Sequence, residues 1–505
     1  MTTFSNIWPD WFLYSENDPM FYTSLLFWIF FTAFLGIYSL VYSKMKTRNS
    51  YLLLISLFFY FKINGFYFLL LLFSCLINYF SGLVIQKSKY RKTVLFFAVA
   101  LNLLFLGFYK YAIFITETIN QIFASQFRMI NWLTYLQNTV TGDSADIYSI
   151  VLPIGISFYT FQAISYLVDV YRKQVQAVHN FLDFSFYLSF FPQLVAGPIV
   201  RASYFIPQLY RKYSLSRQEF SYSLFLILKG LFKKMVIADF LAINFIDRVF
   251  DAPLSFSGIE NLLALYSYAI QIYCDFSGYT DIAIGLALIL GFKIPVNFNA
   301  PYQATSLTDF WHRWHISLSL WLKDYLYIPL GGNRQGKVRM YLNLLATMVL
   351  GGLWHGANLR FIIWGAIHGI ALAVEKFFRS LITIRSKATN LAKGLSIFLT
   401  FNVVSFAWIF FRLDSNEKVH QFFYQMGNHF LPNNSWSEWV VYKNVLIVFA
   451  VGLLLIWTPF RLKEKIRGSF IASPVVIQII LSILLITIIS LISQSSLQPF
   501  IYFRF

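Results

Sequence analysis

The chain has 505 residues, a length that in a soluble protein would correspond to about three domains. Its composition excludes that organisation, because 58% of the residues are hydrophobic and only 12% are charged. The formal net charge is +18, but the basic residues are scattered between hydrophobic runs, which argues against nucleic-acid binding and is typical of positive-inside bias. The two cysteines, Cys75 and Cys274, lie in apolar stretches and predict neither a disulfide framework nor a Cys metal site.

Apolar runs long enough to cross a bilayer as helices recur from end to end of the chain. We expect an all-α, polytopic membrane protein with roughly 11–14 tilted helices around a central funnel, some of them re-entrant or interfacial. It should form one integral-membrane domain over 1–505, with specific motifs between about 150 and 370 and C-terminal helices at 391–505. The clearest apolar runs are 21–43, 93–116, 259–273 extended by 276–292, 391–411 and 472–493.

Charge on either side of the first apolar run predicts its orientation. Residues 1–20 carry three acidic residues and no basic one, whereas Lys44, Lys46 and Arg48 follow the run. No small-residue cleavage site follows it, so we expect a retained helix rather than a signal peptide. The positive-inside rule places the N-terminus outside and the basic run 87–92 in the cytosol of a multi-pass protein of the cell (inner) membrane.

The middle of the chain does not give a clean count of spans. The run 51–85 is interrupted near Gly65 and predicts a short in-and-out pair. We expect a polar loop at 117–146 and a further helix at 147–170. Segment 181–200 is broken by prolines and glycine, and segment 222–248 carries three lysines. Such segments are usually re-entrant, or they line a cavity buried in protein.

The stretch Thr308–Tyr325 predicts one amphipathic helix. On a helical wheel a narrow polar stripe lies within about 60° of His312, and a wide aromatic face lies opposite. An interfacial helix with wet histidines and a helix lining a water-filled funnel both fit this pattern. The stripe comprises Thr308, His312, His315, Ser319 and Lys323, and the aromatic face comprises Trp311, Trp314, Leu318, Trp321, Leu322 and Tyr325.

The distribution of histidines favours the funnel-lining interpretation. Four of the seven lie between 312 and 368. His355 lies in LGGLWHGANLRF and His368 in IIWGAIHG, each flanked by glycines that permit close approach of helices or of a ligand. A single intramembrane His is often a hydrogen-bonded core residue, but ionisable groups at membrane depth are candidates for function.

The absence of several catalytic motifs excludes some classes of reaction. The segment reads HRWH instead of the HExxH of zinc hydrolases, no carboxylate or Cys completes a metal set, and neither a Gly-x-Ser-x-Gly elbow nor a Walker loop occurs. The chemistry that these absences leave is general base catalysis, in which a histidine takes a proton from a hydroxyl. Because no ATP-binding element is present, we expect no bound cofactor and an acyl donor that arrives already activated as a thioester.

The sequence resembles the membrane-bound O-acyltransferase family over most of the chain. Two motifs carry most of the resemblance, one around His315 and one around His355. Within the family, YLYIPLGGNR and FAWIFFR look like the branch that acetylates exopolysaccharides such as alginate. The motifs are LPIGISFYTFQAISYLVDVYR at 152–172, FFPQLVAGPIVR at 190–201, YCDFSGYTDIAIG at 273–285, NFNAPYQATSLTDFWHRWHISLSLWLKDYLYIPLGGNR at 297–334 and LGGLWHGANLRFIIWGAIHG at 350–369.

The resemblance implies helices around a thin centre, where a cytosolic and an external funnel meet near the catalytic His. It implies that His355 of the WHG motif is the key catalytic residue and that His315 of the WHxSLS motif assists it. His312 stands where the family has Arg or another polar residue, so the resemblance implies no catalytic role for it. For His368 a packing role is expected. Possible tunnel-lining residues are Thr308, His312, Ser319, Lys323, His368 and Asp275.

The expected activity is transfer of an acyl group, expected to be acetyl, from a cytosolic thioester to a hydroxyl of an exported polysaccharide. The donor would be acetyl-CoA or an acidic acyl carrier protein, and transfer would be direct or through an external SGNH-type partner. Two alternatives stay open: D-alanyl transfer to teichoic acid at the same site, and a transporter with a histidine proton relay. The basic groups at 87–92 and at 211–217 would either dock the carrier protein or only set topology.

Overall fold

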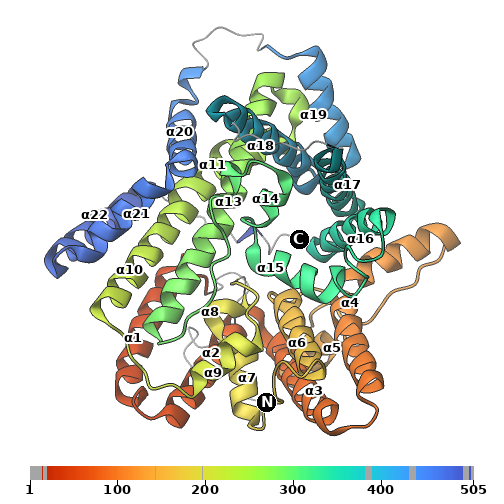
Figure 1. Cartoon of the computed structure of the whole chain (residues 1–505), viewed down its shortest axis with the longest axis vertical. Coiled ribbons are helices and arrows are strands. Elements are labelled where there is room, and N and C mark those ends of the chain that lie inside the picture. Colours follow the sequence, from red (N-terminus) through yellow and green to blue (C-terminus); the bar gives the residue numbers. More distant parts are fainter. Residues whose placement is uncertain are drawn as a thin grey trace. The chain divides into compact units, whose positions relative to one another are not determined.

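The computed structural model describes residue 14 and residues 20–142, 144–195, 197–381, 389–431, 439–492 and 500–501. Every regular element in this part of the chain is a helix, which confirms the all-α, polytopic prediction (Figure 1). Backbone contacts group the chain into two units, 1–214 with 291–294 and 215–290 with 295–505. The expectation of a single domain over 1–505 stays a prediction.

The first unit contains the N-terminal helices. As predicted, the run 51–85 is interrupted: α2 ends at Asn64, and Gly65, with a φ of +55°, begins a short 3₁₀ turn. Buried Asn78 and Asn102 exchange amide hydrogen bonds of 3.1 and 2.8 Å between α3 and α4. The elements are α1 Leu25–Val41, α2 Met45–Asn64, η3 Gly65–Tyr67, α3 Phe68–Lys87, α4 Arg91–Phe123, α5 Trp132–Thr141, α6 Ile156–Tyr171, α7 Phe181–Ser189, α8 Phe191–Leu194 and α9 Ala202–Leu209.

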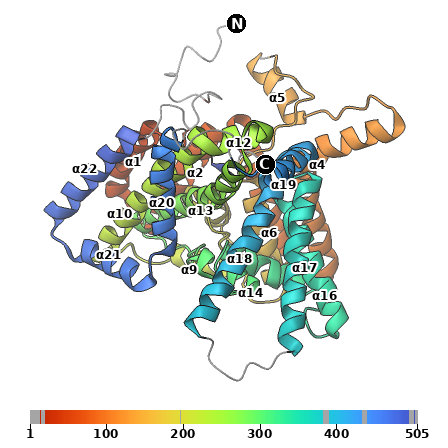
Figure 2. The ribbon, with the colours of Figure 1, turned by 90° about the horizontal axis from the view of Figure 1, so that it is seen from above.

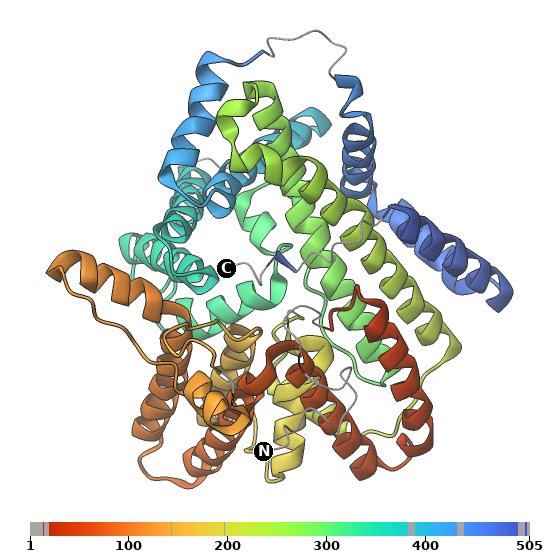
Figure 3. The ribbon, with the colours of Figure 1, turned by 180° about the vertical axis from the view of Figure 1, so that it is seen from behind.

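The second unit contains all of the candidate site residues. Its core helix is α13, a single helix of 32 residues whose most apolar window is 89% buried, and α10 lies beside it (Figure 3). The elements are α10 Arg217–Leu231, η4 Phe232–Ala238, α11 Asp239–Leu241, η5 Ala242–Ile246, α12 Asp247–Asp251, η6 Pro253–Ser255, α13 Gly258–Ile289, η7 Pro301–Gln303, α14 Leu307–Trp311, α15 Ile316–Leu322, η8 Lys323–Tyr327, α16 Lys337–His355, α17 Leu359–Leu381, α18 Asn390–Arg412, α19 Asn416–Asn428, α20 Lys443–Trp457, α21 Phe460–Ala472 and α22 Val475–Ile492.

Helices α16, α17 and α18 pack together in the second unit (Figure 2). The glycines that flank His355 and His368 explain how close α16 and α17 come. A Cβ on Gly352 would collide with the carbonyl oxygen of Phe361, and one on Gly365 would collide with that of Met348. The close approach that was predicted from these glycines is therefore present.

Two predicted boundaries are wrong. The helix expected at 147–170 begins only at Ile156, because Pro153 and the positive φ of +85° at Gly155 keep the preceding residues out of the helix. The polar stretch 117–146 is not a loop throughout, because α4 continues to Phe123 and α5 occupies 132–141. Asn131 caps α5, its side chain accepting from the Thr134 amide.

Among the described residues, six helices are long and apolar enough to cross a membrane, or up to seven if the bent pair α20–α21 is one span. The predicted number was roughly 11–14 by length and hydropathy. The difference has a structural reason. Segment 222–248 contains the π-helical stretches η4 and η5, segment 181–200 is divided into the short helices α7 and α8, and α2 with α3 counts once in the total of six.

Candidate active site

The structure corrects the prediction of one continuous helix over Thr308–Tyr325. Helix α14 ends at Trp311, α15 begins at Ile316, and His315 stands between them with a φ of +41°. A left-handed conformation costs a non-glycine residue about 1–3 kcal/mol and persists only where the surroundings impose it. His315 is also completely buried. It therefore leaves the polar stripe and points into the core of its unit.

Asn297 holds His315 in this position. Its side-chain oxygen accepts hydrogen bonds from the backbone amide and the hydroxyl of Ser317, at 3.1 and 2.9 Å, and lies 3.2 Å from Nδ1 of His315. Its backbone carbonyl accepts from the Ile316 amide at 2.9 Å. Because a backbone N–H can only donate, the Asn297 atom at this point is the oxygen, and Nδ1 of His315 must carry the proton. The lone pair of the neutral ring is then on Nε2.

Burial sets the protonation state of His315. The residue lies outside the candidate membrane spans, and burial lowers its pKa to about 3 because the charged imidazolium loses its hydration. The ring is therefore neutral at physiological pH. A base of such low pKa takes up protons weakly near neutrality, so the site suits His315 for holding or orienting a partner by hydrogen bonding.

His355 is the last residue of α16 and is 4% exposed. The indole of Trp354 connects it with His315: the ring centroids are 5.0 Å apart for Trp354 and His355, and 6.1 Å for Trp354 and His315. His315 also packs against Phe276 of α13, with ring centroids 4.7 Å apart. The structure thus brings the two predicted catalytic histidines into one aromatic cluster.

His368 belongs to the same cluster but lies one ring further away. Trp364 contacts both His355 and His368, with centroid distances of 5.1 and 4.9 Å, and Trp311 contacts His368 at 5.1 Å. Neither ring nitrogen of His368 has a hydrogen-bond partner among the described residues, although the side chain is fully buried. These surroundings fit the packing role expected for His368.

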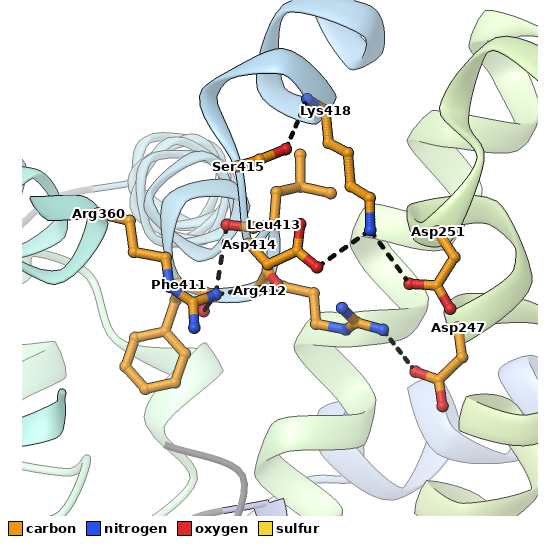
Figure 4. Close-up of polar contacts among 9 residues, drawn as sticks. All are labelled: Asp247, Asp251, Arg360, Phe411, Arg412, Leu413, Asp414, Ser415 and Lys418. Atoms are coloured by element: carbon orange, nitrogen blue, oxygen red, sulfur yellow. Dashed lines mark hydrogen bonds and ion pairs between the residues drawn. The ribbon is translucent and has the colours of Figure 1, made fainter. Parts of the chain in front are cut away.

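The turn that carries His355 is anchored by Arg360 (Figure 4). One guanidinium nitrogen of Arg360 donates to the carbonyl oxygens of Phe411, Arg412 and Leu413 at the C-terminal end of α18, at 3.4, 3.3 and 3.3 Å. The C-terminal end of a helix carries a partial negative charge, so a cation is favourable there. Phe411 also packs against His355 at 5.2 Å, which links the WHG turn to the FAWIFFR segment.

A buried network of ion pairs lies beside this cluster. Lys234, in the π-helical η4, bridges Asp239 at 2.8 Å and Asp275 at 2.9 Å. Asp281 pairs with Lys229 and Lys233, at 3.0 and 2.7 Å. These pairs join α10 and η4 to α13, as polar contacts do between helices packed in a membrane.

Asp275 has a second partner that the sequence did not indicate. Its other oxygen accepts from the backbone amide of Ile501 at 2.8 Å. Phe500 packs against Phe276 and Tyr279, at 5.4 and 4.9 Å. Since Phe276 is also the ring against His315, residues 500–501 lie one aromatic ring from a predicted catalytic histidine. Asp275 therefore contacts protein groups through both carboxylate oxygens.

The other members of the predicted stripe do not join the buried histidines. Thr308, His312 and Lys323 are exposed, and Ser319 is half-buried with its hydroxyl donating to the Trp314 carbonyl at 3.2 Å. The stripe was derived from a helix that would be continuous, and the break at 312–315 separates its members. Within the part of the chain that the structure describes, no three His, Cys, Asp or Glu side chains converge to hold a metal ion.

Sequence reasoning missed Asn297, Trp354, Arg360, Lys234 and the residues 500–501. Asn297 stood inside a quoted motif, NFNAPYQ, but no local signal connects it to a histidine 18 residues away. The lysines of segment 222–248 were noted as charges in an apolar run, which could have prompted a search for Asp275 and Asp281 as partners.

Comparison with known proteins shows the family of the chain. Residues 172–412 match the model of the MBOAT, membrane-bound O-acyltransferase family. A peptidoglycan O-acetyltransferase of Helicobacter pylori is 39% identical over 434 residues, covering 80% of this chain and 78% of that protein. The chain belongs to the membrane-bound O-acyltransferase family. Both histidine motifs, at 315 and 355, fall within the matched range.

Two further relatives of this acyltransferase differ from each other in their named activity. The probable alginate O-acetylase AlgI of Pseudomonas aeruginosa is 40% identical over 78% of this chain and 72% of that protein. A teichoic acid D-alanyltransferase of Streptococcus thermophilus is 30% identical over 55% of this chain and 72% of that protein. The chain is thus a multi-pass membrane acyltransferase, and its similarity to the O-acetylating relatives is higher and more extensive.

Proposed function

We propose that this membrane-bound O-acyltransferase transfers an acetyl group from a cytosolic thioester to a hydroxyl of an exported envelope polysaccharide. The observation that carries the proposal is the buried cluster in which Trp354 contacts both His315 and His355, in a chain about 40% identical to named O-acetylases. Family membership favours an enzyme over the transporter alternative. We place the protein in the inner membrane with its N-terminus outside, as positive-inside bias predicts.

The proposed step uses His355 as general base or relay. Its imidazole takes the proton of the acceptor hydroxyl while the hydroxyl oxygen attacks the thioester carbonyl. The carbon–sulfur bond breaks, an ester forms, and the proton passes to the leaving thiolate. Neutral His315, with its tautomer fixed by Asn297, would orient the donor or the acceptor by a hydrogen bond. The acceptor is either the polysaccharide or an external SGNH-type partner that passes the group on.

D-alanyl transfer at the same site is the second candidate, because the teichoic acid D-alanyltransferases of Streptococcus thermophilus and Bacillus subtilis are 30% and 29% identical over 55% and 46% of this chain. The acyl group and its donor can be tested together. Purified protein in liposomes would be given labelled acetyl-CoA, acetyl carrier protein or D-alanyl carrier protein. Alginate, peptidoglycan or teichoic acid would be outside, with and without an external SGNH-type protein. We expect an alkali-labile acetyl ester on a polysaccharide. A D-alanyl ester alone, or no ester with any donor, would overturn the proposal.

A further inference from the structure

Helices α21 and α22 form a groove outside the candidate active site. It has a volume of about 470 Å³, within the range of about 300–1,000 Å³ of small-molecule sites. Its walls are mostly apolar. Its three polar residues follow each other at intervals of four residues, from the middle of α21 to the residue after its end: Lys465, Ser469 and Ser473. The apolar lining residues are Phe225, Leu462, Ile466, Phe470, Ile477 and Leu481.

The position of α21 suits the membrane surface. The chain bends by 96° between α20 and α21, and none of the residues of α21 is buried (Figure 1). Residues 460–472 contain four basic residues and one acidic residue, a net charge of +3, whereas α22 is strongly apolar. A basic amphipathic helix next to an apolar span is the arrangement that lies in the headgroup region.

Hydrogen bonds connect the helices that form the groove. The side-chain amide of Gln478 donates to the carbonyl oxygens of Phe470 and Ser473, at 3.0 and 3.2 Å, at the corner between α21 and α22. Ser221 of α10 donates to the Gln478 side-chain oxygen at 3.1 Å. These bonds fix α21 and α22 against α10, so the groove exists before any ligand enters it.

The charged residues along the groove indicate the class of ligand. Lys465 lines the groove and is exposed, and exposed Arg217 of α10 donates to the Ser473 carbonyl at 3.3 Å. Two cations and two hydroxyls therefore lie along one side of an apolar groove. We propose that this groove binds an anionic phospholipid, with its phosphodiester at Lys465, Ser469 and Arg217 and an acyl chain along the apolar wall. The site is independent of the proposed acetyl transfer.

Photo-crosslinking tests the proposal on the full-length protein in nanodiscs. The probe is phosphatidylglycerol with a diazirine in its acyl chain, in a phosphatidylcholine background. Crosslinking should saturate with probe and map to α21 or α22. Ile477→Trp fills the groove, and Ile480→Trp is its control because Ile480 is exposed on the same helix and does not line the groove. We expect Ile477→Trp to lower saturable crosslinking roughly fivefold or more, as loss of about 1 kcal/mol or more of binding energy would, and Ile480→Trp to leave it unchanged.

A second pair of variants tests whether binding requires the positive charge of Lys465. Lys465→Gln should weaken phosphatidylglycerol labelling, whereas Arg461→Gln on the same helix, which does not line the groove, should not. Labelling by a phosphatidylcholine probe equal to that by phosphatidylglycerol would overturn the anionic assignment. A second outcome would overturn the site: labelling that does not saturate and is equal in Ile477→Trp and Ile480→Trp. It would mean that the groove contacts lipid no more specifically than the rest of the protein surface.

Discussion

At the scale of single residues, Asn297 is the contact that determines how His315 can act. Asn297→Ala removes the acceptor for Nδ1 and frees the imidazole to change tautomer. We expect kcat to fall about tenfold to a hundredfold with KM nearly unchanged, because orientation in the transition state is lost while donor binding is kept. Asn297→Asp keeps an acceptor oxygen and should recover part of the rate. Equal kcat for Asn297→Ala and the native protein, or no recovery with Asp, would contradict the positioning role.

The lysine pairs make a second prediction, on stability. Lys234→Met leaves buried Asp275 and partly buried Asp239 without their shared cation, which should cost about 3–5 kcal/mol. Lys229→Met is the matched control, because Lys229 is 34% exposed and Asp281 keeps Lys233 as a partner, so its cost should stay below about 1 kcal/mol. Thermal unfolding in one detergent measures both variants. Similar unfolding temperatures for the two would show that the Lys234 network is not a structural requirement.

At the scale of elements, the break between α14 and α15 divides the predicted stripe into solvent-exposed and buried positions. Thr308→Cys and Lys323→Cys should react with a small water-soluble thiol reagent, because both positions are exposed and a thiol must be reached to react. Leu318→Cys and Leu322→Cys should not react. The native Cys75 and Cys274 are fully buried and should stay silent in this assay. Equal labelling of all four positions would indicate a surface helix and contradict the observed packing.

Two basic residues that were expected to set topology also cap helices. Arg48, which follows α1, donates to the carbonyl of Leu209, the last residue of α9, at 2.8 Å and to that of Arg211 just after it at 3.0 Å. Arg91, in the run 87–92, donates to Val170 and Tyr171 at the end of α6, at 3.1 and 2.8 Å. A cation is favourable at the C-terminal end of a helix, which carries a partial negative charge. Arg91 is thus committed within the protein, and carrier docking at 87–92 would depend on its exposed lysines.

At the scale of the whole molecule, hydropathy located the long helices closely. The run 391–411 became α18 at Asn390–Arg412, and 472–493 became α22 at Val475–Ile492, since length and apolar content alone decide such segments. The break at His315 could not be predicted, because it depends on Asn297, and periodicity describes only neighbours on one helix. Ion pairs between different helices, such as Lys234 with Asp275, depend on packing that one sequence does not display.

The candidate site was predictable in its histidines and not in their surroundings. Motif resemblance selected His315 and His355, which lie in one aromatic cluster. The wheel assigned His315 to a wet stripe with His312, whereas His315 is buried and His312 is exposed. The roles of both histidines stay predictions.

The central claim is that His355 carries the acyl transfer, and one measurement tests it most directly. Purified native protein, His355→Ala and His420→Ala would be placed in liposomes with labelled acetyl thioester and polysaccharide, and the ester formed would be counted. His420 is an exposed histidine of the same unit and serves as the control. We predict native ester formation in His420→Ala and a loss of at least about 10²-fold in His355→Ala, with unchanged folding by thermal unfolding. Ester formation near the native rate in folded His355→Ala would contradict the account.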